Sequence, residues 1–170
     1  MNGGRKLNKA DMDADAVARL GVAPSRRWAA LLILGILGAA LLWIALAVPP
    51  AALGLRIGVL VGGLGALWLA VRLHAATGRG LVLTDAELRE AGPGGRTLAR
   101  LDRVRTVDRG ALAFKPSNGF VLHLMPGAGE GRVWAPGSWW RIGNRVGVGG
   151  VLRAAESRAV AEAIALRLAD

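Results

Sequence analysis

The chain has 170 residues, of which 53% are hydrophobic and 20% charged, and its net charge is +10. Apolar residues gathered into blocks exclude an intrinsically disordered chain and an ordinary soluble globular protein. The absence of cysteine excludes disulfides, thiolate metal ligands and cysteine nucleophiles. A membrane surface accounts for the basic excess, and no nucleic-acid recognition motif is present, so nucleic acid is not an expected partner.

Residues 1–27 are predicted to be a cytoplasmic tail. They contain Gly3 and Gly4 and charges of both signs, which is typical of a mobile terminal segment. Within this tail, residues 11–20 are expected to form a short surface helix.

Two apolar segments follow, at 28–48 and 53–73, separated by the four residues 49–52. The first has no charged residue and covers about 30 Å at the rise of an α-helix, which is the thickness of the hydrocarbon layer. Arg56 and Arg72 lie near the ends of the second, where a long side chain can reach the headgroups. The short connection predicts an antiparallel transmembrane helical hairpin over residues 28–73.

Basic residues lie on one side of this hairpin. Arg26 and Arg27 precede the first segment, and Arg72, His74 and Arg79 end or follow the second. The positive-inside rule therefore predicts that both termini are cytoplasmic.

A signal peptide is the competing interpretation, because residues 45–47 resemble a cleavage site behind a basic and apolar leader. The apolar segment is too long for a leader, and the preceding segment contains Asp11, Asp13 and Asp15. We therefore expect the hairpin to be retained.

Small residues recur at every fourth position of the second segment, at Gly58, Gly62, Ala66 and Ala70. Such a stripe lets another helix approach closely. Two interpretations stay open: packing against the first helix of the hairpin, and docking onto a helix of another integral membrane protein.

Residues 79–170 are predicted to be a cytoplasmic β domain. Alternation over 120–124 is typical of a strand, and the spacing of turns favours a small antiparallel β-barrel or sandwich. Turns are predicted at 92–95, 116–119 and 126–129. Helix-forming residues at about 154–169, with Val160 and Ile164 in one apolar stripe, predict a C-terminal helix that caps the domain.

Residues 81–88, a glycine turn, and residues 98–104 and 107–110 together resemble the opening of a bacterial pleckstrin-homology-like domain. Several members of that family carry an N-terminal two-span hairpin. The resemblance covers 72–170 and implies a seven-stranded, half-open barrel capped by the C-terminal helix. Two further segments, 114–120 and 134–140, are similar to segments of a group of bacterial membrane proteins. That similarity implies no activity.

No catalytic, cofactor or metal site is predicted. His74 and His123 have no partner at ligand spacing, and Asp102 and Asp108 are expected to be solvated or capping carboxylates. The glycine-rich segment 143–150 has no Gly-Lys-Ser/Thr motif and is expected to be a flexible turn before the final helix.

Five aromatic and basic residues form the most distinctive cluster: Trp134, Trp139, Trp140, Arg141 and Arg145. Indoles favour the headgroup region, and arginine binds lipid phosphate, so this loop is predicted to contact the inner leaflet or a protein partner there. The alternative is that one tryptophan caps the domain core and the other is incidental.

These features favour a non-catalytic accessory, scaffolding or assembly subunit of the bacterial inner membrane. It is expected to bind another integral membrane protein through the small-residue stripe and the Trp/Arg loop. The second hypothesis is a sensor at the membrane surface. It would bind a lipid, such as an anionic phospholipid, or another ligand. An enzyme is the third, and it lacks a matched catalytic set.

Overall fold

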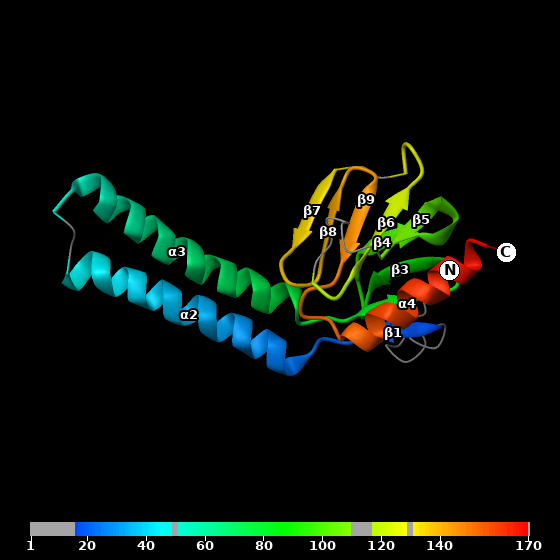
Figure 1. Cartoon of the computed structure of the whole chain (residues 1–170), viewed down its shortest axis with the longest axis horizontal. Coiled ribbons are helices and arrows are strands. Elements are labelled where there is room, and N and C mark those ends of the chain that lie inside the picture. Colours follow the sequence, from blue (N-terminus) through cyan, green and yellow to red (C-terminus); the bar gives the residue numbers. More distant parts are fainter. Residues whose placement is uncertain (1–15, 49–50, 110–116, 129–130, 170) are drawn as a thin grey trace, which may run out of the picture.

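The computed structural model describes residues 16–48, 51–109, 117–128 and 131–169. In this described part, a hairpin of two long helices projects from one end of a β domain (Figure 1). The helices are α2 (Pro24–Ala47), α3 (Leu53–Ala76) and α4 (Ala154–Arg167). The strands are β1 (Ala18–Leu20), β2 (Leu81–Leu83), β3 (Glu87–Glu90), β4 (Thr97–Arg100), β5 (Val104–Asp108), β6 (Phe120–Leu124), β7 (Arg132–Ala135), β8 (Trp139–Ile142) and β9 (Arg145–Val148), with a short 3-10 turn, η1 (Leu101–Arg103), before β5.

Both hairpin helices are long and apolar enough to cross a bilayer, which confirms the two predicted apolar helices. α2 begins at Pro24, before the predicted 28–48 segment, because proline suits the first helical turn, where no N–H donor is needed. α3 ends at Ala76, beyond the predicted 53–73 segment. In the most apolar stretch of each helix, only 11% of α2 and 6% of α3 is buried. A core helix of a soluble protein would be mostly buried.

The two helices touch backbone to backbone where Gly38 of α2 faces Gly63 of α3. A Cβ atom on Gly38 would lie 3.1 Å from the Gly63 carbonyl oxygen, and one on Gly63 would lie 3.2 Å from the Gly38 carbonyl oxygen. Ala45 and Ala66 are buried as well. Small residues therefore let the two hairpin helices approach closely, as expected if they pack against each other. The contact is centred on Gly38 and Gly63, which are not part of the predicted stripe.

The predicted stripe of α3 is divided between two faces. Ala66 is buried and Ala70 is half-buried, whereas Gly58 and Gly62 are exposed. No atom lies within 4 Å of a Cβ built on Gly58, and one on Gly62 meets only the Leu41 side chain, at 3.6 Å. Gly58 is therefore open to another helix, whereas Gly62 lies at the edge of the contact with α2.

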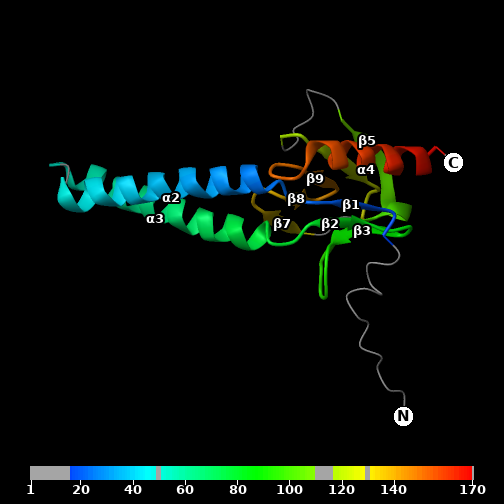
Figure 2. The same ribbon diagram turned by 90° about the horizontal axis from the view of Figure 1, so that it is seen from below.

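The hairpin is inserted between two paired strands of the β domain. β1 precedes α2, β2 follows α3, and the two strands pair antiparallel, with Leu20 opposite Leu81. Figure 2 shows β1 lying between β2 and α4. Leu20 is 1% exposed, so burial of its side chain accounts for the strand. The predicted surface helix over 11–20 is thus wrong at residues 18–20, and residues 11–15 lie outside the described part of the chain.

The nine described strands form two antiparallel sheets, in the orders β1-β2-β3-β4 and β5-β6-β9-β8-β7. Buried side chains from both sheets and from α4 form one core, which includes Leu83, Leu98, Phe120, Val146 and Ile164. No pairing among the described strands closes the sheets into a barrel. The antiparallel β domain and its C-terminal helix are confirmed, and the seven-stranded barrel is not what the described strands form.

Several local predictions are confirmed and one is wrong. β6 and the turn at 92–95 lie as predicted, and α4 buries Val160 and Ile164. The other two predicted turns fall partly outside the described residues. The glycine-rich segment 143–150 is not a flexible turn, because it contains β9, which lies at the centre of the five-stranded sheet between β6 and β8. Its Val148 is fully buried, and burial of that kind outweighs the low strand propensity of glycine.

The chain around β1 is also held by α4. The Glu156 carboxylate accepts a hydrogen bond from the backbone N–H of Gly21 and one from Arg153 Nη1 at 3.0 Å. The hydrogen bond from Gly21 lowers the pKa of Glu156, the neighbouring Arg153 lowers it further, and burial opposes both. The charged carboxylate therefore stabilises this contact.

We expect the Glu156→Gln variant to be less stable at neutral pH by about 1 kcal/mol, because it loses a charge-assisted hydrogen bond at a partly exposed site. A pKa that is lower in the folded state gives stability that is present above the ordinary carboxyl pKa of about 4.3 and is lost as the pH falls through the folded value. Denaturant unfolding of both proteins at pH 7 and pH 3 checks this. A difference in unfolding free energy between wild type and Glu156→Gln that is larger at pH 3 than at pH 7 would contradict this prediction.

Candidate functional site

The residues of the predicted Trp/Arg loop lie in the β-hairpin of β7 and β8 and, for Arg145, at the start of β9. Alternate residues of a strand point to opposite faces, and this rule divides the cluster. Trp139 is 2% exposed, and its indole N–H donates a hydrogen bond to Glu90 Oε1 at 2.9 Å. The Arg141 guanidinium donates to the carbonyl oxygens of Thr97, at 2.9 Å, and Leu98.

These inward residues join the five-stranded sheet to β3 and β4 of the other sheet. Trp139 and Arg141 therefore hold the two sheets together. Trp139 is buried and offers little surface to a partner, whereas Arg141 is half-buried and also lines the groove on the outer face of β7 and β8. For Trp139 this corresponds to the alternative in which one tryptophan caps the core.

The remaining residues of the cluster lie on the outer face of the sheet. Trp134 is paired with Trp140 across β7 and β8, and Trp140 lies opposite Gly147 of β9. A Cβ on Gly147 would clash with the Trp140 indole, at 2.3 Å, so glycine leaves room for the ring. Trp134 and Arg145 are exposed. Trp134, Trp140 and Ile142 line an open, largely apolar groove of about 300 Å³.

Trp134 also borders a second hollow, of about 330 Å³, at the end of the helical hairpin. The last two turns of α3 supply Arg72 to this hollow, the following connection supplies Arg79, and the β3–β4 hairpin supplies Glu90 and Arg96. We call this the basic hollow. It brings three guanidinium groups together from segments that are far apart in the sequence.

The charge of the basic hollow is positive. Among the described residues, no ion pair joins Arg72, Arg79 or Arg96 to a carboxylate. Glu90 accepts hydrogen bonds from the Trp139 indole and, at 3.3 Å, from the backbone N–H of Arg96. The three arginines therefore leave a net positive charge for an anion to neutralise.

Close packing fixes the β7–β8 turn against the end of α3. Gly137, in this turn, has φ 77°, and a Cβ there would lie 2.5 Å from Leu73 Cδ1. Thr77 is buried, and its hydroxyl donates to the Leu73 carbonyl oxygen at 2.6 Å. This tight contact holds in place the turn whose Pro136 lines the basic hollow.

The first turn of α2 is tied to the same end of α3. Arg27 Nη2 lies 3.1 Å from His74 Nδ1 and donates to the His74 carbonyl oxygen at 3.3 Å. Nearby, the Arg72 guanidinium lies over the Trp68 ring, 5.5 Å from its centre. This end of the hairpin therefore combines cations with indoles.

The sequence pattern indicated part of the basic hollow. In the sequence, Arg72 and Arg79 predict the orientation of the hairpin, and nothing in the local pattern marks Arg96 or Glu90 as a site residue. Only the pairing of β3 with β4, and the packing of β7 near α3, bring them together. No local motif would have found them.

Comparison with protein-family models, with curated proteins and with solved structures finds no match to this chain. The described residues contain no group of three or more His, Cys, Asp or Glu side chains that could hold a metal ion. The three guanidinium groups of the basic hollow are suited to attract an anion.

Proposed function

We propose that the hairpin spans the inner membrane of a bacterium with both termini in the cytoplasm, and that the basic hollow binds the headgroup of an anionic phospholipid. On this proposal the protein is a non-catalytic membrane-surface module. The observation that carries it is the group of Arg72, Arg79 and Arg96 at the end of an apolar helix, without carboxylate partners among the described residues.

The position of these arginines suits a headgroup. Trp28 and Trp68 are 58% and 56% exposed near this end of the hairpin, where indoles prefer the lipid–water boundary. Arg72 follows Trp68 by one turn of α3 and stacks on it. A lipid phosphate inside the basic hollow would contact the guanidinium groups of all three arginines. Trp134 would then lie beside the lipid.

The arrangement of the domain also supports the pleckstrin-homology-like resemblance as part of this proposal. Two antiparallel sheets and a C-terminal helix share one core, which agrees with the resemblance in the antiparallel strands and the final helix, though not in the seven-stranded barrel. In the part that carries the resemblance, β2, a Thr84 turn, β3, a glycine turn, β4 and the short helix η1 follow one another in the expected order.

An accessory role in a complex is the second candidate function. The exposed face of α3 that carries Gly54, Gly58 and Gly65 has no atom within 4 Å of an added Cβ at these positions. A helix of another integral membrane protein could therefore pack closely there. The groove bordered by Trp134, Trp140 and Ile142 offers that partner a second contact outside the bilayer.

Lipid retention by the full-length protein tests the first proposal. The protein is reconstituted in mixed phosphatidylglycerol and phosphatidylcholine, extracted in mild detergent and analysed by native mass spectrometry. We expect wild type to retain phosphatidylglycerol selectively. The Arg79→Gln/Arg96→Gln double variant should lose about 1 kcal/mol of binding per arginine, or roughly thirtyfold in affinity.

The matched control is the Arg103→Gln/Arg105→Gln double variant, which removes the same charge from exposed positions in η1 and β5. It should retain phosphatidylglycerol as wild type does. Equal losses in the two double variants would show that only overall charge matters, and the proposed site would be wrong.

A further inference from the structure

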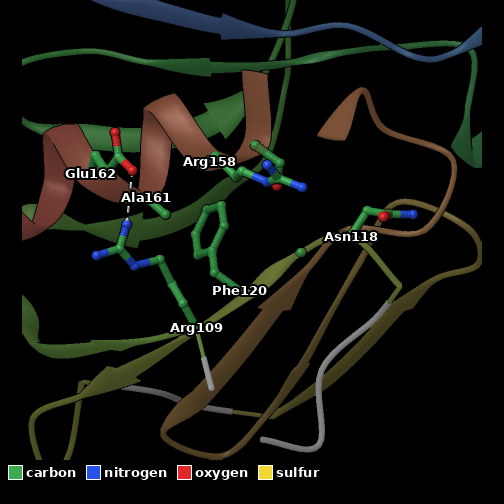
Figure 3. Close-up of a pocket in the computed structure, with 8 residues that line it drawn as sticks. Arg109, Asn118, Phe120, Arg158, Ala161 and Glu162 are labelled. Atoms are coloured by element: carbon green, nitrogen blue, oxygen red, sulfur yellow. Dashed lines mark hydrogen bonds and ion pairs between the residues drawn. The ribbon is translucent and has the colours of Figure 1, made fainter. Parts of the chain in front are cut away.

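A third hollow lies within the β domain, between α4 and the start of β6 (Figure 3). Its volume is about 430 Å³, which is within the range of small-molecule sites. The described residues that line it include Asn118, Phe120, Ser157 and Arg158. None of these residues belongs to the basic hollow.

Ser157 is the most unusual of these residues. Ser157 is 1% exposed, and its hydroxyl oxygen has no hydrogen-bond partner among the residues that the structure describes. A buried hydroxyl without a partner is unfavourable and calls for a specific explanation. Since Ser157 lines the hollow, a bound molecule could supply the missing partner.

The hollow also carries a positive charge that no neighbouring carboxylate balances. Arg109 is paired with Glu162, at 3.2 Å, and this pair lies on one side of the Phe120 ring in Figure 3. Arg158 extends on the other side, toward Asn118 in this view, and it has no hydrogen bond or ion pair with a described residue. An anion in the hollow would therefore meet an uncompensated guanidinium.

The backbone holds Asn118 in place at the same hollow. Asn118 has φ 57°, in the left-handed region that asparagine tolerates better than most residues. A Cβ on the next residue, Gly119, would lie 1.7 Å from the Val148 carbonyl oxygen. Only glycine fits there, so the turn packs tightly on the end of β9 and fixes the backbone of Asn118 beside the hollow.

We propose that this hollow binds a small solute that carries a carboxylate or phosphate group. Arg158 supplies the opposite charge, the Ser157 hydroxyl and the Asn118 amide supply hydrogen bonds, and the Phe120 ring forms an apolar wall. The ligand is a soluble anion, distinct from the phospholipid of the basic hollow. The β domain then combines a lipid site with a site for a soluble ligand.

The test uses the full chain in phosphatidylcholine nanodiscs, which have no net charge, in a buffer free of phosphate. Inorganic phosphate and acetate are titrated separately, and the amide resonances of residues 118, 119, 157 and 158 are followed by NMR. We expect saturable shifts at these amides with at least one of the two anions. The anion that binds more tightly identifies the class of the ligand.

Three variants assign the effect to the hollow. Arg158→Gln should weaken binding about tenfold, because a hydrogen bond to a charged group is lost. Ser157→Ala should weaken binding severalfold without lowering the unfolding temperature, since it removes a hydroxyl that bonds to no described residue. Arg105→Gln, at an exposed position of β5, is the control and should bind as wild type does.

The absence of saturable shifts with both anions would overturn the proposal. So would unchanged affinity in both Arg158→Gln and Ser157→Ala. The Arg79→Gln/Arg96→Gln double variant should bind the soluble anion normally, so the two sites can be judged independently.

Discussion

The Leu20→Asp variant is expected to unfold the β domain while the hairpin remains helical. Leu20 lies in β1, is 1% exposed, and belongs to the core shared by both sheets and α4. Removing a buried leucine side chain costs about 2–5 kcal/mol, and a buried carboxylate without a partner adds to that cost. A total of this size is comparable with the whole stability of a typical domain, about 5–15 kcal/mol.

Hydrogen exchange of the full chain in nanodiscs measures this effect. Amides of β6 and β9 should be protected in wild type and exchange freely in Leu20→Asp. The matched control is Val17→Asp, which introduces the same charge three residues earlier at a side chain that is 48% exposed. In the wild type, the backbone N–H of Val17 donates to the Leu83 carbonyl oxygen at 2.8 Å, and the substitution leaves this donor in place. Protected β6 and β9 amides in Leu20→Asp would show that β1 is dispensable.

The Gly63→Leu variant is expected to push the two hairpin helices apart. Even a Cβ on Gly63 would lie 2.9 Å from Leu42 Cγ and 3.2 Å from the Gly38 carbonyl oxygen. A larger side chain cannot be accommodated without separation, and overpacking of this kind costs about 1–3 kcal/mol. Gly58→Leu, on the exposed face of α3, should leave the hairpin unchanged.

Spin labels measure the separation directly. Because the chain has no cysteine, single cysteines can be introduced at the exposed positions Leu46 and Leu55 without competing thiols. We expect a longer and broader distance distribution in Gly63→Leu and a wild-type distribution in Gly58→Leu. If the accessory role is correct, Gly58→Leu should still lose an integral membrane partner that co-purifies with wild type. A wild-type distribution in Gly63→Leu would contradict the close contact of the two glycines.

The insertion of the hairpin between β1 and β2 has a consequence for how the domain is held. The connections from the strands to the helices are residues 21–23 and 77–80, and both are short. The β domain is thus attached at two adjacent points, and Gly137 packs against Leu73 beside one of them. Two short connections and this close contact restrict how far the domain can turn relative to the hairpin.

The same insertion bears on how the domain can be studied. Residues 79–170 alone lack β1, and without it Leu81 and Leu83 of β2 lose their neighbour in the sheet. Experiments on ligand binding therefore require the full chain.

Local patterns in the sequence were sufficient for the elements whose stability is local. The helices α2 and α3 follow from long apolar segments, and α4 from its spacing of apolar residues. Alternation over 120–124 identified β6. In each of these, the residues that determine the element are neighbours in the chain.

Other features depended on partners far away in the sequence. β1 is a strand because β2, more than 60 residues later, pairs with it, and β9 is a strand because β6 and β8 flank it. Alternation required Trp139 and Trp140 to face opposite ways, but only the packing of β3 and β4 decided which of them is buried.

The sequence by itself therefore determined that two apolar helices precede a basic β domain with a final helix. The tertiary structure decided which glycines bring the helices together and which arginines form the basic hollow. It also placed Ser157 and Arg158 beside Asn118. The physical reason is that apolar runs and alternation act over a few residues, whereas charge clusters and close contacts arise only when distant segments pack.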